Sequence, residues 1–347
     1  MRRETLRLFR CPDCQGSLAL MEDRGGLDVV ESGRLSCAGC GSTYPIHRAV
    51  PRFVDQKNYS SNFGFQWNRF RRTQLDSWTR TSISRDRFFR QSDWTPEDLK
   101  GKTVLDVGCG AGRFTEIALA SGAEVVSMDY SGAVDACRAN FAPHERLTVV
   151  QGDLYRLPFR PNRFDFVYCF GVLQHTPDVE RAFLALAEPL RPGGRLAVDL
   201  YPMLRANLLW PKYWLRPLTR RVPPDRLFPL VERMVSVLFP VSLALGRVPL
   251  VGRRLRYVIP VANYEGRLPL TREQLEQWAV LDTFDMLAPH YDQPQTPATV
   301  ESWFRRAGFN SIEVFRDGLV VGRGRLPLED PLRPDPPATR TPHHVAT

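Results

Sequence analysis

A group of glycines and acidic residues in the middle of the chain has the types and spacing needed to bind a nucleoside. Residues 104–112 read VLDVGCGAG, an apolar strand that contains Asp106 and runs into three alternating glycines: Gly108, Gly110 and Gly112. Glycines at a strand-to-helix turn let the backbone approach a ligand closely. A second apolar run, 124–128, ends in Asp129. An acid at the tip of this strand can accept hydrogen bonds from both ribose hydroxyls, so these residues predict a nucleoside site.

The spacing of the glycines indicates which nucleoside. A dinucleotide fingerprint requires G-x-G-x-x-G, and here the third glycine comes one residue early, with Arg113 at the position of the last. The pattern D-x-G-x-G-x-G resembles motif I of the class I, Rossmann-like S-adenosylmethionine-dependent methyltransferases. Gly152-Asp153 after a third strand and the turn Arg191-Pro192-Gly193-Gly194 before a fifth resemble further motifs of that family. The alternative is another nucleotide-binding Rossmann domain.

The resemblance implies a set of residues around S-adenosylmethionine, the co-substrate. In the family, the acid of the Gly-Asp dipeptide, here Asp153, faces the adenine amino group. The predicted cofactor-binding residues follow from the matching motifs and their neighbours: Asp106, Gly108, Cys109, Gly110, Gly112, Asp129, Tyr130, Asp153, Leu154 and Phe170.

Few side chains near this predicted site could act as a base. His175 follows the fourth strand, where substrates lie in the resembling family, and His290 and Tyr291 belong to a segment, 283–292, that we expect to be a loop returning to the site. The alternative for His175 is a place in the pocket wall. No Asn/Asp-Pro-Pro-Tyr signature follows the fourth strand, where Phe170-Gly171-Val172-Leu173 stands, which argues against methylation of adenine amino groups or protein glutamine.

Four cysteines near the N-terminus have the spacing of a metal site. Cys11 and Cys14 form one C-x2-C pair, and Cys37 and Cys40 form another twenty-two residues later. Two such pairs can bring four thiolates onto one tetrahedral Zn²⁺, and about fifty residues bury too little apolar surface to fold well without such a cross-link. The segment resembles the zinc ribbons of the tRNA-methyltransferase-activator type. We predict a structural zinc whose loss unfolds this module and spares the rest; a redox pair or a ribbon that no longer holds metal is the alternative.

The elements that position these residues predict an α/β fold. Five strands alternate with helices between 101 and 201, and two more strands, 311–315 and 319–322, are joined by a three-residue turn and must form a hairpin. One strand is therefore antiparallel to the rest, as in the seven-stranded sheet of the class I methyltransferases. Residues 57–90 are rich in aromatic residues and arginine and are expected to form a helical cap, in which Tyr59 and Phe65 either reach the ligand or only pack.

A long insertion separates the fifth strand from the last helix. Residues 203–260 contain eleven basic and two acidic residues, which equals the whole formal charge excess of +9. We expect a helix over 229–245 that Pro240 interrupts. Three interpretations of the insertion are open: a lid over the substrate, a surface for an anionic membrane or a lipid-linked substrate, and an RNA-binding surface. The segment lacks the glycines and separate aromatic platforms that proteins binding single-stranded RNA use, which disfavours the third.

These observations divide the chain into a zinc ribbon (1–55), a helical cap (56–98), a methyltransferase core (99–202 and 296–325), a basic apolar insertion (203–295) and a disordered tail (326–347). No apolar leader follows Met1, and reduced cysteines with metal spacing point to the cytoplasm, with a possible site at the inner membrane face.

The expected function is methyl transfer from S-adenosylmethionine to an oxygen or nitrogen of a small-molecule, glycan or lipid-linked acceptor, with nucleic acid disfavoured. The alternatives are an RNA methyltransferase and a non-catalytic subunit whose ribbon docks on a partner. The guanine-N1 rRNA methyltransferases also join a cysteine module to such a core, but this chain lacks their global basicity.

Overall fold

The computed structural model describes residues 1–55, 58–203, 211–248, 252 and 258–328. Its centre is a seven-stranded sheet in the order β10-β11-β9-β8-β5-β6-β7. Neighbouring strands from β9 to β7 are parallel, whereas β11 is antiparallel to both β9 and β10. The predicted fold, with its antiparallel last strand, is therefore confirmed. The strands are β5 (Thr103–Val107), β6 (Glu124–Asp129), β7 (Leu147–Gln151), β8 (Phe164–Phe170), β9 (Leu190–Leu200), β10 (Asn310–Asp317) and β11 (Leu319–Arg325).

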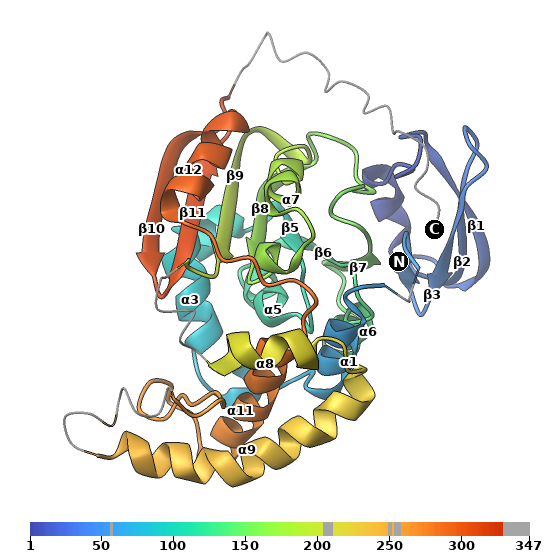
Figure 1. Cartoon of the computed structure of the whole chain (residues 1–347). Helices are drawn as coiled ribbons and strands as arrows, with labels where there is room; N and C mark the ends of the chain where they lie inside the picture. Colours follow the sequence, from blue (N-terminus) through green and yellow to red (C-terminus); the bar gives the residue numbers. More distant parts are fainter. Residues whose placement is uncertain (56–57, 204–210, 249–251, 253–257, 329–347) are drawn as a thin grey trace.

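Helices cover both faces of this sheet, as the βαβ connections require (Figure 1). The central strands are buried almost completely; Val104 and Leu105 of β5 and Val167 of β8 are fully inaccessible. Strand β9 begins at Leu190, so the turn predicted at Arg191–Gly194 lies inside the strand, where its pairing with β8 shifts register. The core helices are α5 (Arg113–Ala120), α6 (Val134–Phe141), α7 (Val179–Ala185) and α12 (Pro297–Arg306), with the 3-10 turn η2 (Leu173–His175) after β8.

The N-terminal module is a small four-stranded antiparallel sheet that packs on the β7 edge of the core. Its short last strand continues into Arg52, which forms a parallel bridge with Gln151 of β7. Phe9 and Phe53 of the module belong to the same buried cluster as Phe159 of the core. The module contains η1 (Arg3–Leu8), β1 (Leu18–Gly25), β2 (Val30–Cys37), β3 (Thr43–His47) and β4 (Val50–Pro51).

The first cap helix and the insertion form a helical layer beyond the carboxyl ends of the strands, whereas the third cap helix packs on β9 and β11 of the sheet (Figure 1). The cap consists of α1 (Ser61–Arg69), α2 (Asp76–Thr79), α3 (Ile83–Ser92) and α4 (Pro96–Leu99), and the insertion contributes α8 (Pro211–Thr219), α9 (Pro224–Gly246) and α11 (Arg272–Leu287). The two parts share a cluster in which Phe65 of α1 packs on Phe228 of α9 and Phe284 of α11.

Two predictions about the insertion are wrong. Pro240 does not interrupt the helix, because α9 continues from Pro224 to Gly246 and its buried face holds it against α11. Residues 283–287 are not loop: they form the last turn of α11, which begins at a capping box between Thr271 and Gln274. The Arg216 side chain donates hydrogen bonds to the carbonyl oxygen of Met286, in the last turn of this helix, and to that of Pro289, just beyond its end.

Candidate active site and metal centre

The glycine loop joins β5 to α5 in backbone conformations that favour glycine. Gly108 has φ of +79° and Gly110 of +53°. A Cβ on Gly108 would lie 2.3 Å from a methyl carbon of Val172, so this position also has no room for a side chain. The loop therefore requires glycine both for its backbone angles and for close packing.

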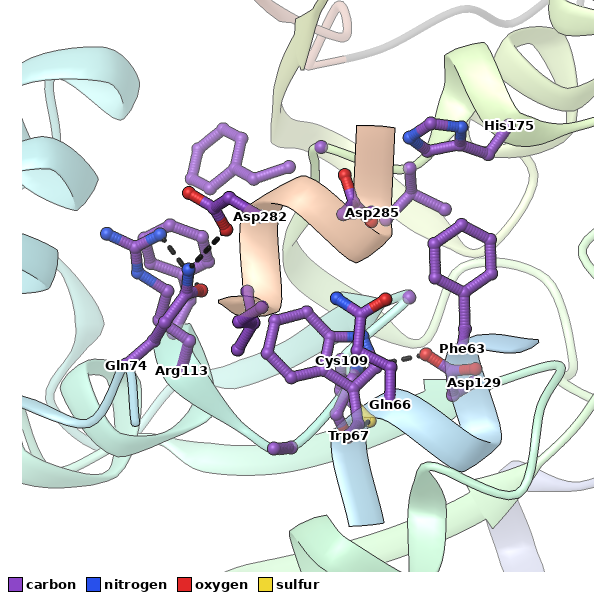
Figure 2. Close-up of a pocket in the computed structure, with 18 of the residues that line it drawn as sticks. Phe63, Gln66, Trp67, Gln74, Cys109, Arg113, Asp129, His175, Asp282 and Asp285 are labelled. Atoms are coloured by element: carbon purple, nitrogen blue, oxygen red, sulfur yellow. Dashed lines mark hydrogen bonds between the residues drawn. The ribbon is translucent and has the colours of Figure 1, made fainter. Parts of the chain in front are cut away.

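Asp129 lies directly beside this loop at the end of β6 (Figure 2). Its Oδ2 accepts a hydrogen bond from the Gly110 amide at 2.9 Å, and its Oδ1 accepts from the Ser131 amide at 2.8 Å and the Ser131 hydroxyl at 2.7 Å. Burial raises the pKa of Asp129, and these donors oppose the rise. The carboxylate is thus fixed at the cavity wall, where it can still accept hydrogen bonds from a ligand.

A cavity of about 740 Å³ opens above these strand ends, within the size range of small-molecule sites. Its floor is made of the ends of β5, β6 and β8, and its other walls come from α1, α3, α11 and the loop 264–269. Most of the predicted cofactor residues line it: Gly108, Cys109, Gly110, Asp129, Tyr130, Asp153, Leu154 and Phe170.

Two predicted cofactor residues, Asp106 and Gly112, do not line the cavity. Asp106 is buried beneath the loop, where its Oδ2 accepts a hydrogen bond from the Thr115 hydroxyl at 2.6 Å. Burial raises its pKa to about 7. Gly112 packs under the ring of Phe141. Asp106 thus ties the loop to α5, and Gly112 packs against α6.

The predicted catalytic residues are placed differently from one another. His175 lines the cavity, and its Nδ1 lies 2.9 Å from the carbonyl oxygen of Tyr291. A ring nitrogen that faces a carbonyl oxygen carries the hydrogen, which leaves Nε2 as the basic nitrogen. His290 is exposed and does not line the cavity. Tyr291 also lies outside the lining; its ring packs edge-on against Tyr59.

The cavity contains residues that the sequence reasoning did not name as site residues, although Asp285 lies in the segment 283–292 that the sequence predicts to return to the site. Gln66 and Trp67 enter from α1, Asp282 and Asp285 enter from α11, and Arg113 lies with Gln74 at one side (Figure 2). The acid pair has the i, i+3 spacing of one helix face, a signal that is visible once 283–287 is read as helix. Of the two cap aromatics considered, Tyr59 lines the cavity, and Phe65 packs in the helical layer instead.

The four cysteines of the N-terminal module converge as predicted. The Sγ atoms of Cys11, Cys14, Cys37 and Cys40 all lie within 4.8 Å of one another, with Cys11–Cys40 at 3.6 Å and Cys14–Cys37 at 3.4 Å. Zn–S bonds of about 2.3 Å place the sulfurs of a tetrahedral site about 3.8 Å apart. Gly16 packs against two of the sulfurs, where a Cβ would lie 3.2 Å from each. The residues therefore fit a structural zinc.

Comparison with known proteins agrees with this geometry. Residues 105–198 match the family profile "Methyltransferase domain", and residues 2–48 match "Trm112p-like protein". Together the two profiles match less than half of the chain, the first in the sheet core and the second in the N-terminal module. The two matched segments are joined by a bridge between Phe9 and Phe159.

Curated relatives and solved structures resemble parts of the chain. The ubiquinone biosynthesis O-methyltransferase of Coxiella burnetii is 37% identical over 28% of this chain and 43% of its own length. The demethylmenaquinone methyltransferase of Thermobifida fusca is 36% identical over 34% of this chain and 51% of its own. The chain thus spans about half the length of these relatives. The magnesium protoporphyrin IX methyltransferase of Synechocystis has a TM-score of 0.40 at 16% identity, over 77% of this chain and 96% of that one.

Proposed function

We propose that the protein is an S-adenosylmethionine-dependent methyltransferase that acts on an oxygen or nitrogen of a small-molecule, glycan or lipid-linked acceptor. The observation that carries the proposal is Asp129, fixed by the Gly110 amide at the wall of a cavity that the cap and insertion cover. The third glycine of the loop comes one residue too early for a dinucleotide site, and the cavity has room for a nucleoside beside a second small molecule.

Different residues of the cavity bind the donor and position it for transfer. When bound, S-adenosylmethionine supplies a methyl group on a positively charged sulfur. Asp129 would accept hydrogen bonds from the ribose hydroxyls of this donor, and Asp153 with Leu154 would hold its adenine. Trp67, which packs on Gly110 with ring atoms 3.2 Å from the position of a Cβ, excludes water from the loop. Methyl transfer requires mainly alignment and exclusion of water, and the helical layer supplies both.

The lid interpretation of the insertion is supported by α11, which contributes Trp278, Leu281, Asp282, Asp285 and Met286 to the cavity lining. A cavity walled on this side by protein favours an acceptor that enters as a small molecule or as the end of a lipid. The names of the two curated relatives, which refer to ubiquinone biosynthesis and to demethylmenaquinone, are in keeping with such acceptors.

We also propose that α9 places the enzyme at an anionic membrane. By length and composition this helix could cross a bilayer, but its buried face packs on the helical layer, so it lies along the molecule (Figure 1). On its outer side Leu230, Val237 and Val241 are 63%, 61% and 44% exposed, and Arg226 and Arg233 are exposed beside them. Apolar and basic residues on one helix side are typical of interfacial helices.

A non-catalytic docking role for the module is disfavoured by its contacts. Arg52, directly after β4, and the ring of Phe9 already contact Gln151 of this chain's own β7 and Phe159 of its core. Incubation of the purified protein with methyl-labelled S-adenosylmethionine and a lipid and metabolite extract tests the function. A labelled small product supports the proposal, whereas binding of the donor without any transfer to such an extract contradicts it.

A further inference from the structure

The cavity contains two carboxylates that the donor does not account for. Asp282 and Asp285 are one helical turn apart on α11, and both line the cavity; the Asp282 carboxylate lies on the side of Gln74 and Arg113 (Figure 2). Their described partners are neutral. Gln74 Nε2 lies 3.5 Å from Asp282 Oδ1, the Tyr264 hydroxyl also donates to Asp282, and the Tyr201 hydroxyl donates to Asp285 Oδ2 at 3.1 Å. Both acids therefore retain lone pairs for a ligand.

Gln66 is a second, independent sign of a ligand. Its side chain is completely buried, yet neither its Nε2 nor its Oε1 has a hydrogen-bond partner among the described residues. A buried amide left unpaired costs free energy, so its presence in the lining of a cavity points to a partner supplied by a bound molecule. An amide offers one donor group and one acceptor, the combination that a hydroxyl group can satisfy.

The surroundings of the acid pair select among possible acceptor groups. Two guanidinium groups lie on the same side: Arg113 packs over the ring of Trp278 at 5.3 Å, and Arg87 pairs with buried Asp199. Asp199 balances the charge of Arg87, but Arg113 disfavours the binding of an ammonium group, and the two acids disfavour the binding of an anion. Phe63, Trp67 and Trp278 provide flat apolar walls. A neutral hydroxyl on a planar apolar body fits all of these conditions.

We propose that Asp282 is the base that accepts the proton of a hydroxyl acceptor, and that Gln66 and Asp285 position this hydroxyl. The inference rests on the proposed methyltransferase function and narrows it to O-methylation. In the step, the acceptor oxygen forms a bond to the methyl carbon as the carbon–sulfur bond breaks and its electron pair stays on sulfur. The hydroxyl proton passes to the Asp282 carboxylate, which leaves a neutral ether and a neutral thioether.

The charge state of Asp282 is compatible with this role. Burial, together with the nearby Asp285, raises its pKa to about 7, whereas Tyr264 from the lid loop, Arg113 from α5 and Arg87 from α3 act in the opposite direction. A base with a pKa near the working pH combines an adequate ionised fraction with adequate basicity.

The test uses 2-naphthol, a planar hydroxyl compound, and 2-methoxynaphthalene, which has the same body without the hydroxyl hydrogen. In calorimetry, protein loaded with S-adenosylhomocysteine should bind 2-naphthol at least tenfold more tightly than 2-methoxynaphthalene, and Gln66→Leu should abolish that preference. Equal binding of the two probes, or binding of neither, overturns the proposal. Failure to bind S-adenosylhomocysteine would instead contradict the proposed function itself.

Transfer to 2-naphthol then tests the base. Asp282→Asn should lower kcat by about 10²-fold or more and remove the lower limb, near pH 7, of the pH profile of kcat/KM. Its affinity for S-adenosylhomocysteine should stay within twofold of wild type, which shows that the site remains folded. Glu273→Gln, an exposed acid on the same helix, should change neither value. An Asp282→Asn enzyme with wild-type kcat and an unchanged pH profile, in particular one whose activity depends on His175, overturns the assignment.

Discussion

The backbone amide of Gly110 donates a hydrogen bond to the carboxylate of Asp129 at 2.9 Å, which ties the glycine loop after β5 to the tip of β6. The two residues are nineteen positions apart in the chain, and parallel pairing of β5 with β6 brings them together. The loop and the acid therefore form one unit, and a substitution in either should weaken binding of the donor.

One prediction concerns the cysteine module. Protein purified without chelator should contain one zinc per chain by elemental analysis, and Cys14→Ser should lose it. Because Phe9 and Phe53 of the module share a buried cluster with Phe159 of the core, metal loss should lower the melting temperature of the whole protein. This revises the expectation from sequence, in which the core is spared. A metal-free protein with an unchanged melting curve would contradict the zinc assignment.

A second prediction concerns the attachment of the module. The Arg52 side chain is 4% exposed and donates to Gln151 Oε1 at 2.8 Å and to Asp135 Oδ1 at 2.7 Å. Loss of one partner of a buried ion pair costs about 3–5 kcal/mol; since Asp135 is 33% exposed, we expect about 2–3 kcal/mol for Arg52→Ala. Denaturant unfolding measures the loss, with Arg34→Ala on the exposed side of β2 as the control. An equal effect of the two changes would argue against this contact.

The third prediction follows from the raised pKa of Asp282. The folded protein holds this proton up to about pH 7, whereas the unfolded chain releases it near the ordinary value of 3.8. The native state therefore binds more protons between these values, and its stability falls as the pH rises through this window. Asp282→Asn should melt a few degrees above wild type at pH 8 and at nearly the same temperature at pH 4. Calorimetry that finds the same difference at both pH values would refute the shift.

The fourth prediction concerns the outer side of α9. Each basic residue near an anionic bilayer contributes about 1 kcal/mol, so wild type should co-sediment with phosphatidylglycerol vesicles and be released by salt. Changing Arg226 and Arg233 to Glu, or Leu230 and Val237 to Ser, should abolish sedimentation. Arg316→Glu on exposed β10 makes the same kind of charge change at one position away from α9 and should have no effect. If the wild-type protein does not co-sediment with these vesicles, the membrane proposal is wrong and α9 only supports the lid.

How far the sequence could predict the site differs between its two halves. The donor half is local: Gly108, Gly110 and Asp129 follow strands whose apolar pattern is clear, and parallel strands end at one edge. The acceptor half is assembled from distant segments. Asp282 comes from a helix more than 150 residues after Asp129, and its place depends on packing with α1 and α9 that no local pattern specifies.

The same contrast explains the errors in the insertion. Pro240 argues locally against a continuous helix, but α9 is held by buried contacts of Phe239 and Leu243 with the helical layer, which outweigh the local cost. Arg253, Arg254 and Arg256, which the sequence includes among the basic residues of a membrane surface, lie outside the described residues.

Binding of the donor tests the central claim most directly. In calorimetry with S-adenosylhomocysteine, wild type should bind, and Asp129→Ala should weaken binding by about 1.5–3 kcal/mol, a factor of about ten to a hundred and fifty, through loss of charge-assisted hydrogen bonds to the ribose. NADH in the same cell should give no heat of binding. Unchanged affinity in Asp129→Ala, or tight binding of NADH by wild type, would contradict the account.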